Sequence, residues 1–172
     1  MKLKNKNIWS AVMIVLIIAF DRLTKHLAAL YLSGKSAVTF IKGVAEFTYA
    51  ENTGVAFSMF SGGRWFFILL TAAVSAVCII YMYKSKTAQK NLWLFWSLGV
   101  IVSGALGNLI DRIALGYVID FINPTFVDFA VFNIADCAVT LGTVSLVLYL
   151  VYDMLREAKK EKADEHSDKS DS

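Results

Sequence analysis

Charge is scarce in this sequence and is unevenly spread. Asp, Glu, Lys and Arg make up only 18% of the 172 residues, whereas 57% are hydrophobic. With the 10 glycines, the apolar share reaches about 63%, against the 45–50% that is typical of soluble globular chains. This composition argues against a soluble domain and favours a chain that crosses a lipid bilayer.

Two further scarcities argue against whole classes of function. The net charge is only +3 and the basic residues are scattered, so no surface for nucleic acid is expected. The two cysteines, Cys78 and Cys137, form neither a C-x-x-C pair nor a ligand cluster with the two histidines. This argues against a disulfide framework, a zinc site and a thiol oxidoreductase. No metal or organic cofactor is expected.

Four apolar stretches are long enough to cross a bilayer as helices. We predict spans at residues 8–32, 65–83, 92–111 and 133–152. The second and third each contain 19 consecutive residues without a charge, and the fourth carries Asp136 as its only charge. The first holds three charges but would extend about 37 Å as a helix. A cleaved signal peptide is the alternative for this first stretch, but no A-x-A-like cleavage site follows it.

The distribution of Lys and Arg predicts which loops face the cytoplasm. Three lysines precede the first span, three lie between the second and third, and five Lys or Arg residues follow the fourth. Residues 113–134 contain none, and residues 33–64 contain three that are spread out. The positive-inside rule therefore places both termini in the cytoplasm and these two loops outside. Residues 1–156 would form the membrane domain, and the charged residues 157–172 a disordered tail.

The first outer loop has a pattern typical of a β-hairpin. Residues 44–50 alternate in part, and residues 55–60 are again apolar and aromatic, with a turn signal at Glu51-Asn52-Thr53-Gly54 between them. We expect a small hairpin on the outer membrane surface, whose apolar side chains rest on lipid or on a lipid-like ligand. A loop that only links two helices is the alternative.

Polar residues are concentrated in one layer near the outer ends of the spans. They are Asp21, Lys25, Asn108, Asp111, Arg112, Asp120, Asn133 and Asp136. Ionisable groups at membrane depth are costly, so a cluster of them indicates a functional site. Some of these residues also have a structural explanation, since Asn133 and Asp136 fit a helix N-cap, and Asp21 with Lys25 is an i,i+4 pair.

Asp120 is the hardest of these residues to explain by structure alone. It is flanked by Tyr117-Val118-Ile119 and Phe121-Ile122, so we expect it to be partly desolvated, with a raised pKa. A second carboxylate nearby would let the pair hold one proton near neutral pH. One member could then deprotonate a water while the other protonates a carbonyl oxygen, as in aspartic proteases. A proton-coupled transporter or channel is the alternative, but a relay places ionisable groups through the membrane depth.

Five stretches, in register, resemble the signature blocks of the lipoprotein signal peptidase (signal peptidase II) family. They are Asp21-Arg-Leu-Thr-Lys25, Asn52-Thr-Gly54-Val-Ala56-Phe, Gly104-Ala-Leu-Gly-Asn108-Leu-Ile-Asp111-Arg112, Val118-Ile-Asp120-Phe and Phe132-Asn133-Ile-Ala-Asp136. The resemblance implies an all-α membrane aspartic endopeptidase of the bacterial cell membrane, with its active site near the extracytoplasmic face. It implies cleavage of diacylglyceryl-modified prolipoproteins immediately before the modified cysteine, with membrane lipid as the other partner.

The resemblance also implies roles for individual residues. By motif match, Asp120 and Asp136 correspond to the catalytic pair. The residues expected to support the site are Asn108, Asp111, Arg112, Asn133, Asp21 and Lys25, and those expected to bind substrate are Asn52, Gly54 and Ala56. The sequence departs from the family at Arg22, where glutamine is common, and by the short interval between the two aspartates. These departures affect loop shape and leave the catalytic groups in place.

Overall fold

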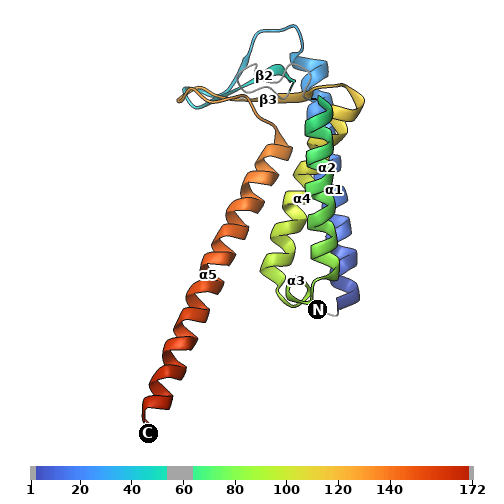
Figure 1. Cartoon of the computed structure of the whole chain (residues 1–172). Helices are drawn as coiled ribbons and strands as arrows, with labels where there is room; N and C mark the ends of the chain where they lie inside the picture. The colour runs from blue at the N-terminus through green and yellow to red at the C-terminus, as the bar shows by residue number, and fades with distance from the viewer. Residues whose placement is uncertain (1–2, 54–63, 171–172) are drawn as a thin grey trace.

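The computed structural model describes residues 3–53 and 64–170, and four of its helices are long and apolar enough to cross a membrane. The elements in chain order are α1 Leu3–Leu32, β1 Val38–Ile41, β2 Ala45–Asn52, α2 Arg64–Lys84, α3 Lys86–Lys90, α4 Leu92–Ala114, β3 Val118–Pro124 and α5 Ile134–Ser170. In Figure 1 the sheet lies at one end of the long helices, and α5 extends beyond them at the other end.

The four spans predicted from hydropathy are confirmed as helices α1, α2, α4 and α5. The main difference is at the C-terminus, where α5 continues to Ser170, although the sequence predicted a disordered tail from residue 157. The reason is local, because the chain after Gly142 contains no proline or glycine and its charged part is rich in Lys, Glu and Ala. These residues favour a helix even without packing partners.

Helix α4 is the centre of the helix bundle. Of the 18 consecutive residues that make up its most apolar stretch, 61% are buried. The corresponding stretches of the other three spans are only 11–22% buried. Glycines on α4 allow this close packing: a Cβ on Gly104 would lie 2.2 Å from the Ala135 carbonyl oxygen, and one on Gly107 would lie 2.8 Å from Asp21 Oδ2. The C-terminal half of α4, toward the sheet, is therefore held against both α1 and the start of α5.

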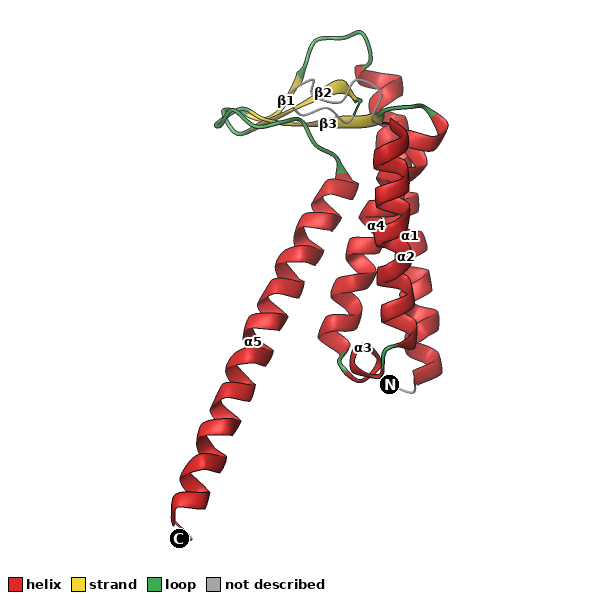
Figure 2. Cartoon of the chain, in the orientation of Figure 1, coloured by secondary structure: helices red, strands yellow, loops and turns green. Residues whose placement is uncertain are grey.

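The sheet has three antiparallel strands in the order β1-β2-β3 (Figure 2). Strands β1 and β2 form a hairpin in the loop where one was predicted, but with a different pair of strands, and Gly43, with a φ of 74°, lies in the turn between them. Strand β3 comes from the connection between α4 and α5 and pairs with β2, so that Asn52 lies opposite Val118 and Ala50 opposite Asp120. The sheet thus joins the two loops, both predicted to be outside, that the sequence analysis treated separately.

The position of the hairpin turn predicted from the sequence is wrong. Glu51 and Asn52 end strand β2 instead of forming a turn, because pairing with Ile119 and Val118 of β3 satisfies their backbone groups in an extended conformation. For the same reason Asp120 lies in a strand and not in a loop. The second predicted strand, residues 55–60, lies outside the described residues.

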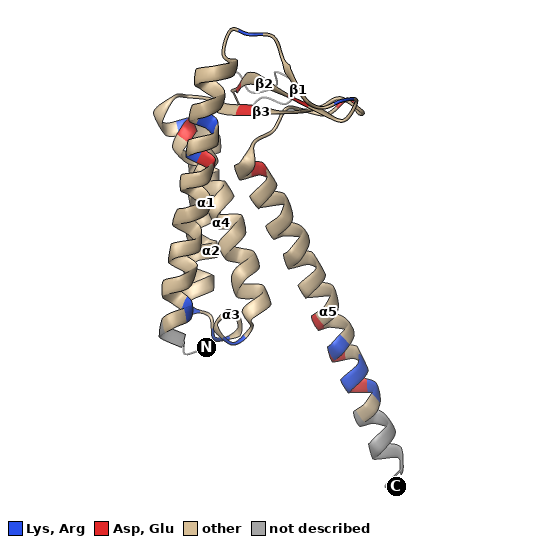
Figure 3. Ribbon diagram, turned by 180° about the vertical axis from the view of Figure 1, so that it is seen from behind, with Lys and Arg blue, Asp and Glu red and all other residues tan. Residues whose placement is uncertain are grey.

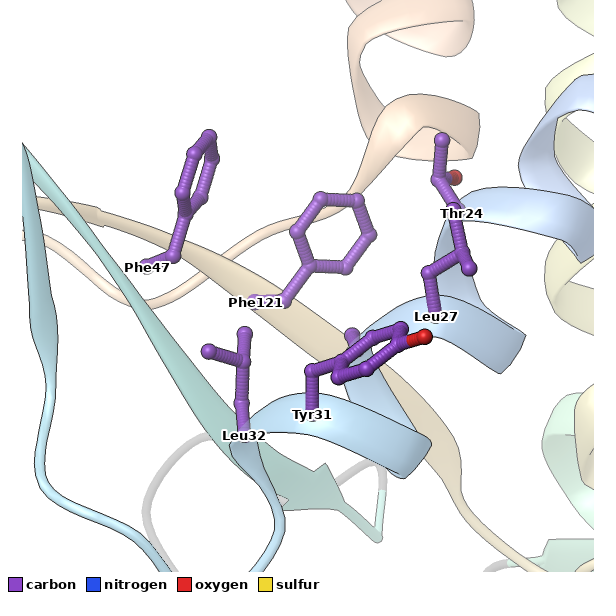
Figure 4. A pocket seen from close by; sticks show the side chains of 7 residues that line it. Thr24, Leu27, Tyr31, Leu32, Phe47 and Phe121 are labelled. Carbon is purple, nitrogen blue, oxygen red and sulfur yellow. The ribbon is translucent and has the colours of Figure 1, made fainter.

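The sheet is anchored on the C-terminal end of α1 by apolar contacts. Ala28 of α1 packs with Ile119 and Phe121 of β3 in one buried cluster. Beside this cluster, Figure 4 shows Phe47 and Phe121 from the sheet facing α1 across an apolar hollow of about 270 Å³. Since side chains alternate along a strand, the packing of Phe121 toward α1 directs its neighbour Asp120 to the other face, toward α4 and α5.

Candidate active site

Asp120 and Asp136 are linked by one residue, Asn133, through its side chain and its backbone N–H. The Asn133 amide nitrogen Nδ2 donates a hydrogen bond of 2.6 Å to Asp120 Oδ1. The backbone N–H of Asn133 donates to Asp136 Oδ2 over 3.1 Å. The structure therefore brings the two aspartates singled out in the sequence to the same residue, although β3 and α5 are separate elements.

The N-terminus of α5 explains why Asp136 is held in place. Asn133 precedes the helix, and its side-chain oxygen Oδ1 accepts a hydrogen bond of 3.0 Å from the backbone N–H of Asp136. With the reverse bond from the Asn133 N–H to the Asp136 carboxylate, this is a reciprocal N-terminal cap. The positive end of the helix dipole further stabilises negative charge on Asp136. The capping and the functional interpretations of Asp136 are therefore compatible.

Asn108 of α4 connects Asp136 to a buried lysine. Its Nδ2 donates to Asp136 Oδ1 over 2.7 Å. Its Oδ1 accepts from Lys25 Nζ over 2.8 Å and from Asn133 Nδ2 over 3.1 Å. These contacts fix which way the Asn108 amide faces, so that its nitrogen is always presented to the carboxylate of Asp136.

Lys25, which donates to Asn108, belongs to a buried group of ion pairs. Lys25 is completely buried, and its Nζ lies 2.9 Å from both Asp21 Oδ2 and Asp111 Oδ2. Asp111 also pairs with Arg22, and Asp21 Oδ1 accepts a hydrogen bond of 2.9 Å from the backbone N–H of Ala135 on α5. In Figure 3 charged segments of α1 and α4 lie together at the sheet end, further basic segments lie at the opposite end, and the middle of the bundle carries no charge.

Arg22 is a member of the site that the sequence analysis missed. It was noted only as a departure from the family pattern, yet it neutralises Asp111 together with Lys25. The signal available in the sequence was its position between Asp21 and Lys25 in the outer part of an apolar helix, where an unpaired charge is costly.

Asp120 is almost fully buried, at 2% exposure. Its Oδ2 accepts a hydrogen bond of 2.9 Å from Asn52 Nδ2. Burial raises the pKa of Asp120, and the negative charge of Asp136 adds to the increase, while the bonds from Asn52 and Asn133 and the positive charge of Lys25 oppose it. The net effect is a raised pKa, as the sequence analysis expected, so Asp120 holds a proton at a higher pH than an ordinary aspartate.

A cavity of about 540 Å³ opens onto Asp136. Its polar edge includes Asn52 and Asp136, and its remaining lining is predominantly apolar: Phe129, Ala130, Val131, Phe132, Cys137, Thr140 and Leu141. Such a cavity suits an extended peptide segment with apolar side chains, one of whose peptide bonds lies near the Asp136 carboxylate. Within residues 3–53 and 64–170, no group of three or more His, Cys, Asp or Glu residues is arranged to hold a metal ion.

The other residues expected at the site are placed as follows. Asp21, Lys25, Asn108, Asp111 and Asn133 belong to one connected network with the two aspartates. Arg112, which is half-buried at the end of α4, interacts electrostatically with both aspartates. Of the three residues expected to bind substrate, Asn52 contacts Asp120, and Gly54 and Ala56 lie outside the described residues.

The chain is similar to known proteins over most of its length. The sequence profile of the family described as "Signal peptidase (SPase) II" matches residues 13–152. A lipoprotein signal peptidase of Streptococcus thermophilus (strain CNRZ 1066) is 41% identical over 139 residues, covering 81% of this chain and 90% of the relative. One of Streptococcus pyogenes serotype M5 (strain Manfredo) is 39% identical over 137 residues, covering 80% and 89%.

Two solved structures, both described as bacterial membrane enzymes, share the fold. One superimposes with a TM-score of 0.78 at 32% identity over 84% of this chain and 93% of its own. The other gives 0.77 at 31% identity over 84% and 88%. These matches confirm the resemblance seen in the five sequence blocks and set aside the transporter alternative. Because the family profile spans most of the chain, the chain belongs to the signal peptidase II family of aspartic peptidases.

Proposed function

We propose that this chain cleaves the signal peptide from diacylglyceryl-modified prolipoproteins, immediately before the modified cysteine, and that Asp120 and Asp136 carry out the hydrolysis. The observation that carries the catalytic assignment is the contact of both aspartates with Asn133. The substrate class is supported by the relatives from Streptococcus, which are described as lipoprotein signal peptidases.

The two aspartates would have different roles at the start of the reaction. Asp120 is the protonated member, because burial raises its pKa, and it gives its proton to the carbonyl oxygen of the scissile peptide bond. Asp136 is the ionised member, because donors on both of its oxygens and the helix N-terminus stabilise its charge. It takes a proton from the attacking water and later returns it to the leaving amine.

The substrate would reach the pair from within the bilayer. Moving an acyl chain into water costs about 0.8 kcal/mol per CH₂, so the diacylglyceryl group stays in the membrane and the scissile bond enters laterally between helices. The 540 Å³ cavity beside Asp136 has the apolar lining that an extended signal-peptide segment requires. The three-stranded sheet would lie over the entering substrate at the membrane surface.

Substituting Asn52 tests whether its contact with Asp120 matters to the reaction. We expect Asn52→Ala to slow cleavage roughly 10- to 100-fold, because leaving a buried hydrogen-bond acceptor without its donor costs about 1–3 kcal/mol. Since the Asn52 bond lowers the pKa of Asp120, its loss raises that pKa further, and the high-pH limit of activity moves to higher pH. The measurement is the cleavage rate of a lipid-modified precursor across pH.

Glu51→Ala is the matched control for this experiment. Glu51 is adjacent on β2, and its carboxylate accepts a hydrogen bond from Tyr49 on its own strand. We expect its removal to leave both the rate and the pH profile unchanged. If Asn52→Ala behaves like this control, Asn52 has no part in the reaction.

The orientation in the membrane is proposed from the charge distribution. Both termini would be cytoplasmic, and the sheet with the two aspartates would lie at the extracytoplasmic face. We expect a reporter fused after Lys86 or at Ser172 to give a cytoplasmic signal, and one inserted near Asn123 to give an external signal. A cytoplasmic signal at Asn123 would place Asp120 on the wrong side for exported precursors and would refute this orientation.

A further inference from the structure

Arg64, the first residue of α2, binds the C-terminal end of α4. Its Nε donates a hydrogen bond of 3.0 Å to the carbonyl oxygen of Arg112, and its Nη2 donates one of 2.9 Å to the carbonyl oxygen of Ile113. Both carbonyls belong to the last turn of α4, where the helix itself offers no donor. A cation at this end of a helix is also favoured by the helix dipole.

The same guanidinium fills the corner where α4 leads into β3. Gly116 makes this turn with a φ of 92°, and a Cβ on it would lie 3.3 Å from Arg64 Nη1. Asp120 follows four residues later, on β3. Arg64 is therefore packed against the short piece of backbone that separates α4 from the strand carrying Asp120.

The hydrogen bond from Arg64 to the Arg112 carbonyl oxygen bears on the reaction, because Arg112 also interacts with the two aspartates. Its guanidinium interacts electrostatically with both Asp120 and Asp136, and its own carbonyl oxygen is the one that Arg64 Nε binds. The last turn of a helix is free to fray unless its carbonyls are capped. Without Arg64, the carbonyl oxygens of Arg112 and Ile113 in this last turn would lose the donors that Arg64 supplies.

We propose that Arg64 is a positioning residue of the peptidase, which fixes the direction in which α4 presents Arg112 to the aspartate pair. This inference rests on the catalytic roles proposed above for Asp120 and Asp136. Arg64 acts through Arg112 and through the turn at Gly116, so its contribution is to the rate of the chemical step and to the electrostatics of the pair, and not to substrate binding.

The test compares Arg64→Ala, Arg64→Gln and Arg64→Lys with the wild-type protein, purified with lipid and acting on a diacylglyceryl-modified precursor. We expect Arg64→Ala to lower kcat by about tenfold to hundredfold, the range for a misplaced catalytic group, with little change in KM. The pH profile should move to higher pH, because Arg112 favours the ionised carboxylates less well when it is displaced. Arg64→Lys should recover part of kcat, since an ammonium replaces the charge but not the two-pronged contact.

Lys84→Gln is the matched control, because Lys84 is an exposed cation at the opposite end of the same helix. It should leave kcat and the pH profile unchanged. An unchanged kcat in Arg64→Ala would overturn the proposal. A lower kcat that only follows the fraction of folded protein, with an unchanged pH profile, would also overturn it and leave Arg64 as a helix cap.

The same assay separates this inference from the function on which it rests. Asp120→Asn is measured beside the Arg64 variants. Cleavage by Asp120→Asn would refute the catalytic assignment itself, whereas an inactive Asp120→Asn with a normal Arg64→Ala refutes only the role of Arg64. If Arg64→Ala does not fold, the pH profiles of Arg64→Gln and Arg64→Lys decide the question.

Discussion

Replacing either aspartate by asparagine is expected to abolish cleavage, with a loss of rate of about four orders of magnitude or more. An amide has nearly the shape of a carboxylate, so Asp120→Asn and Asp136→Asn keep the packing around Asn133 and Asn108. The amide cannot accept a proton from water or give one to a carbonyl oxygen, which are the two steps assigned to the pair. The measurement is single-turnover cleavage of a diacylglyceryl-modified precursor.

Two comparisons make this experiment specific. Asp153→Asn makes the same chemical change on the same helix α5, far from the pair, where Asp153 accepts a hydrogen bond from Tyr149. It should cleave at the wild-type rate. The double variant of Asp120 and Asp136 should be little worse than either single variant, because the two act as one unit. Turnover near the wild-type rate in either single variant would remove that aspartate from the mechanism.

Several local features of the site could be predicted from the sequence, because charges in apolar surroundings are conspicuous. Asp120 between apolar neighbours pointed to a desolvated carboxylate, and the spacing of Asp21 and Lys25 indicated an ion pair on one helix, which the structure confirms. The cap formed by Asn133 at the start of α5 is also confirmed. Each of these features depends on residues close together in the sequence.

The partners across helices could not be predicted in the same way. That Asn108 bonds both Lys25 and Asp136 depends on how α1, α4 and α5 cross, and no local pattern gives those crossings. Arg22 was passed over because its partner, Asp111, lies on another helix. Helix periodicity shows which face of a helix is polar, but it does not show which neighbouring helix that face contacts.

The pairing of strands β2 and β3 in the sheet could not be predicted from local sequence either. The strand-forming character of β2 was recognised, but Glu51-Asn52-Thr53-Gly54 was interpreted as a turn from its residue types. Pairing between β2 and β3, which are separated in the chain by α2, α3 and α4, overrides that local preference and extends β2 to Asn52. This non-local pairing is also what brings Asn52 to Asp120, so the error in the fold and the missed contact have one cause.

Lys25→Met is expected to lower the free energy of unfolding by about 3–5 kcal/mol, the cost of removing one partner from a buried ion pair. Lys25 is completely buried and lies 2.9 Å from Asp21 Oδ2. Among the described residues that oxygen has no hydrogen-bond partner to replace Lys25, whereas Asp111 keeps Arg22. The measurement is reversible unfolding in mixed micelles, followed by the helical signal, with the exposed Lys35→Met as control.

Adding Asp21→Asn to Lys25→Met separates the electrostatic cost from the catalytic one. The second substitution removes the unpaired charge, and the amide oxygen can still accept the Ala135 N–H, so much of the lost stability should return. Activity should recover less than stability, because Asn108 Oδ1 still lacks the Lys25 donor and keeps only Asn133 Nδ2 to orient its amide toward Asp136. A Lys25→Met protein as stable as the wild type would show that the buried charges are neutralised by protonation and not by Lys25. Recovery of activity together with stability in the double variant would show that Lys25 serves only the fold.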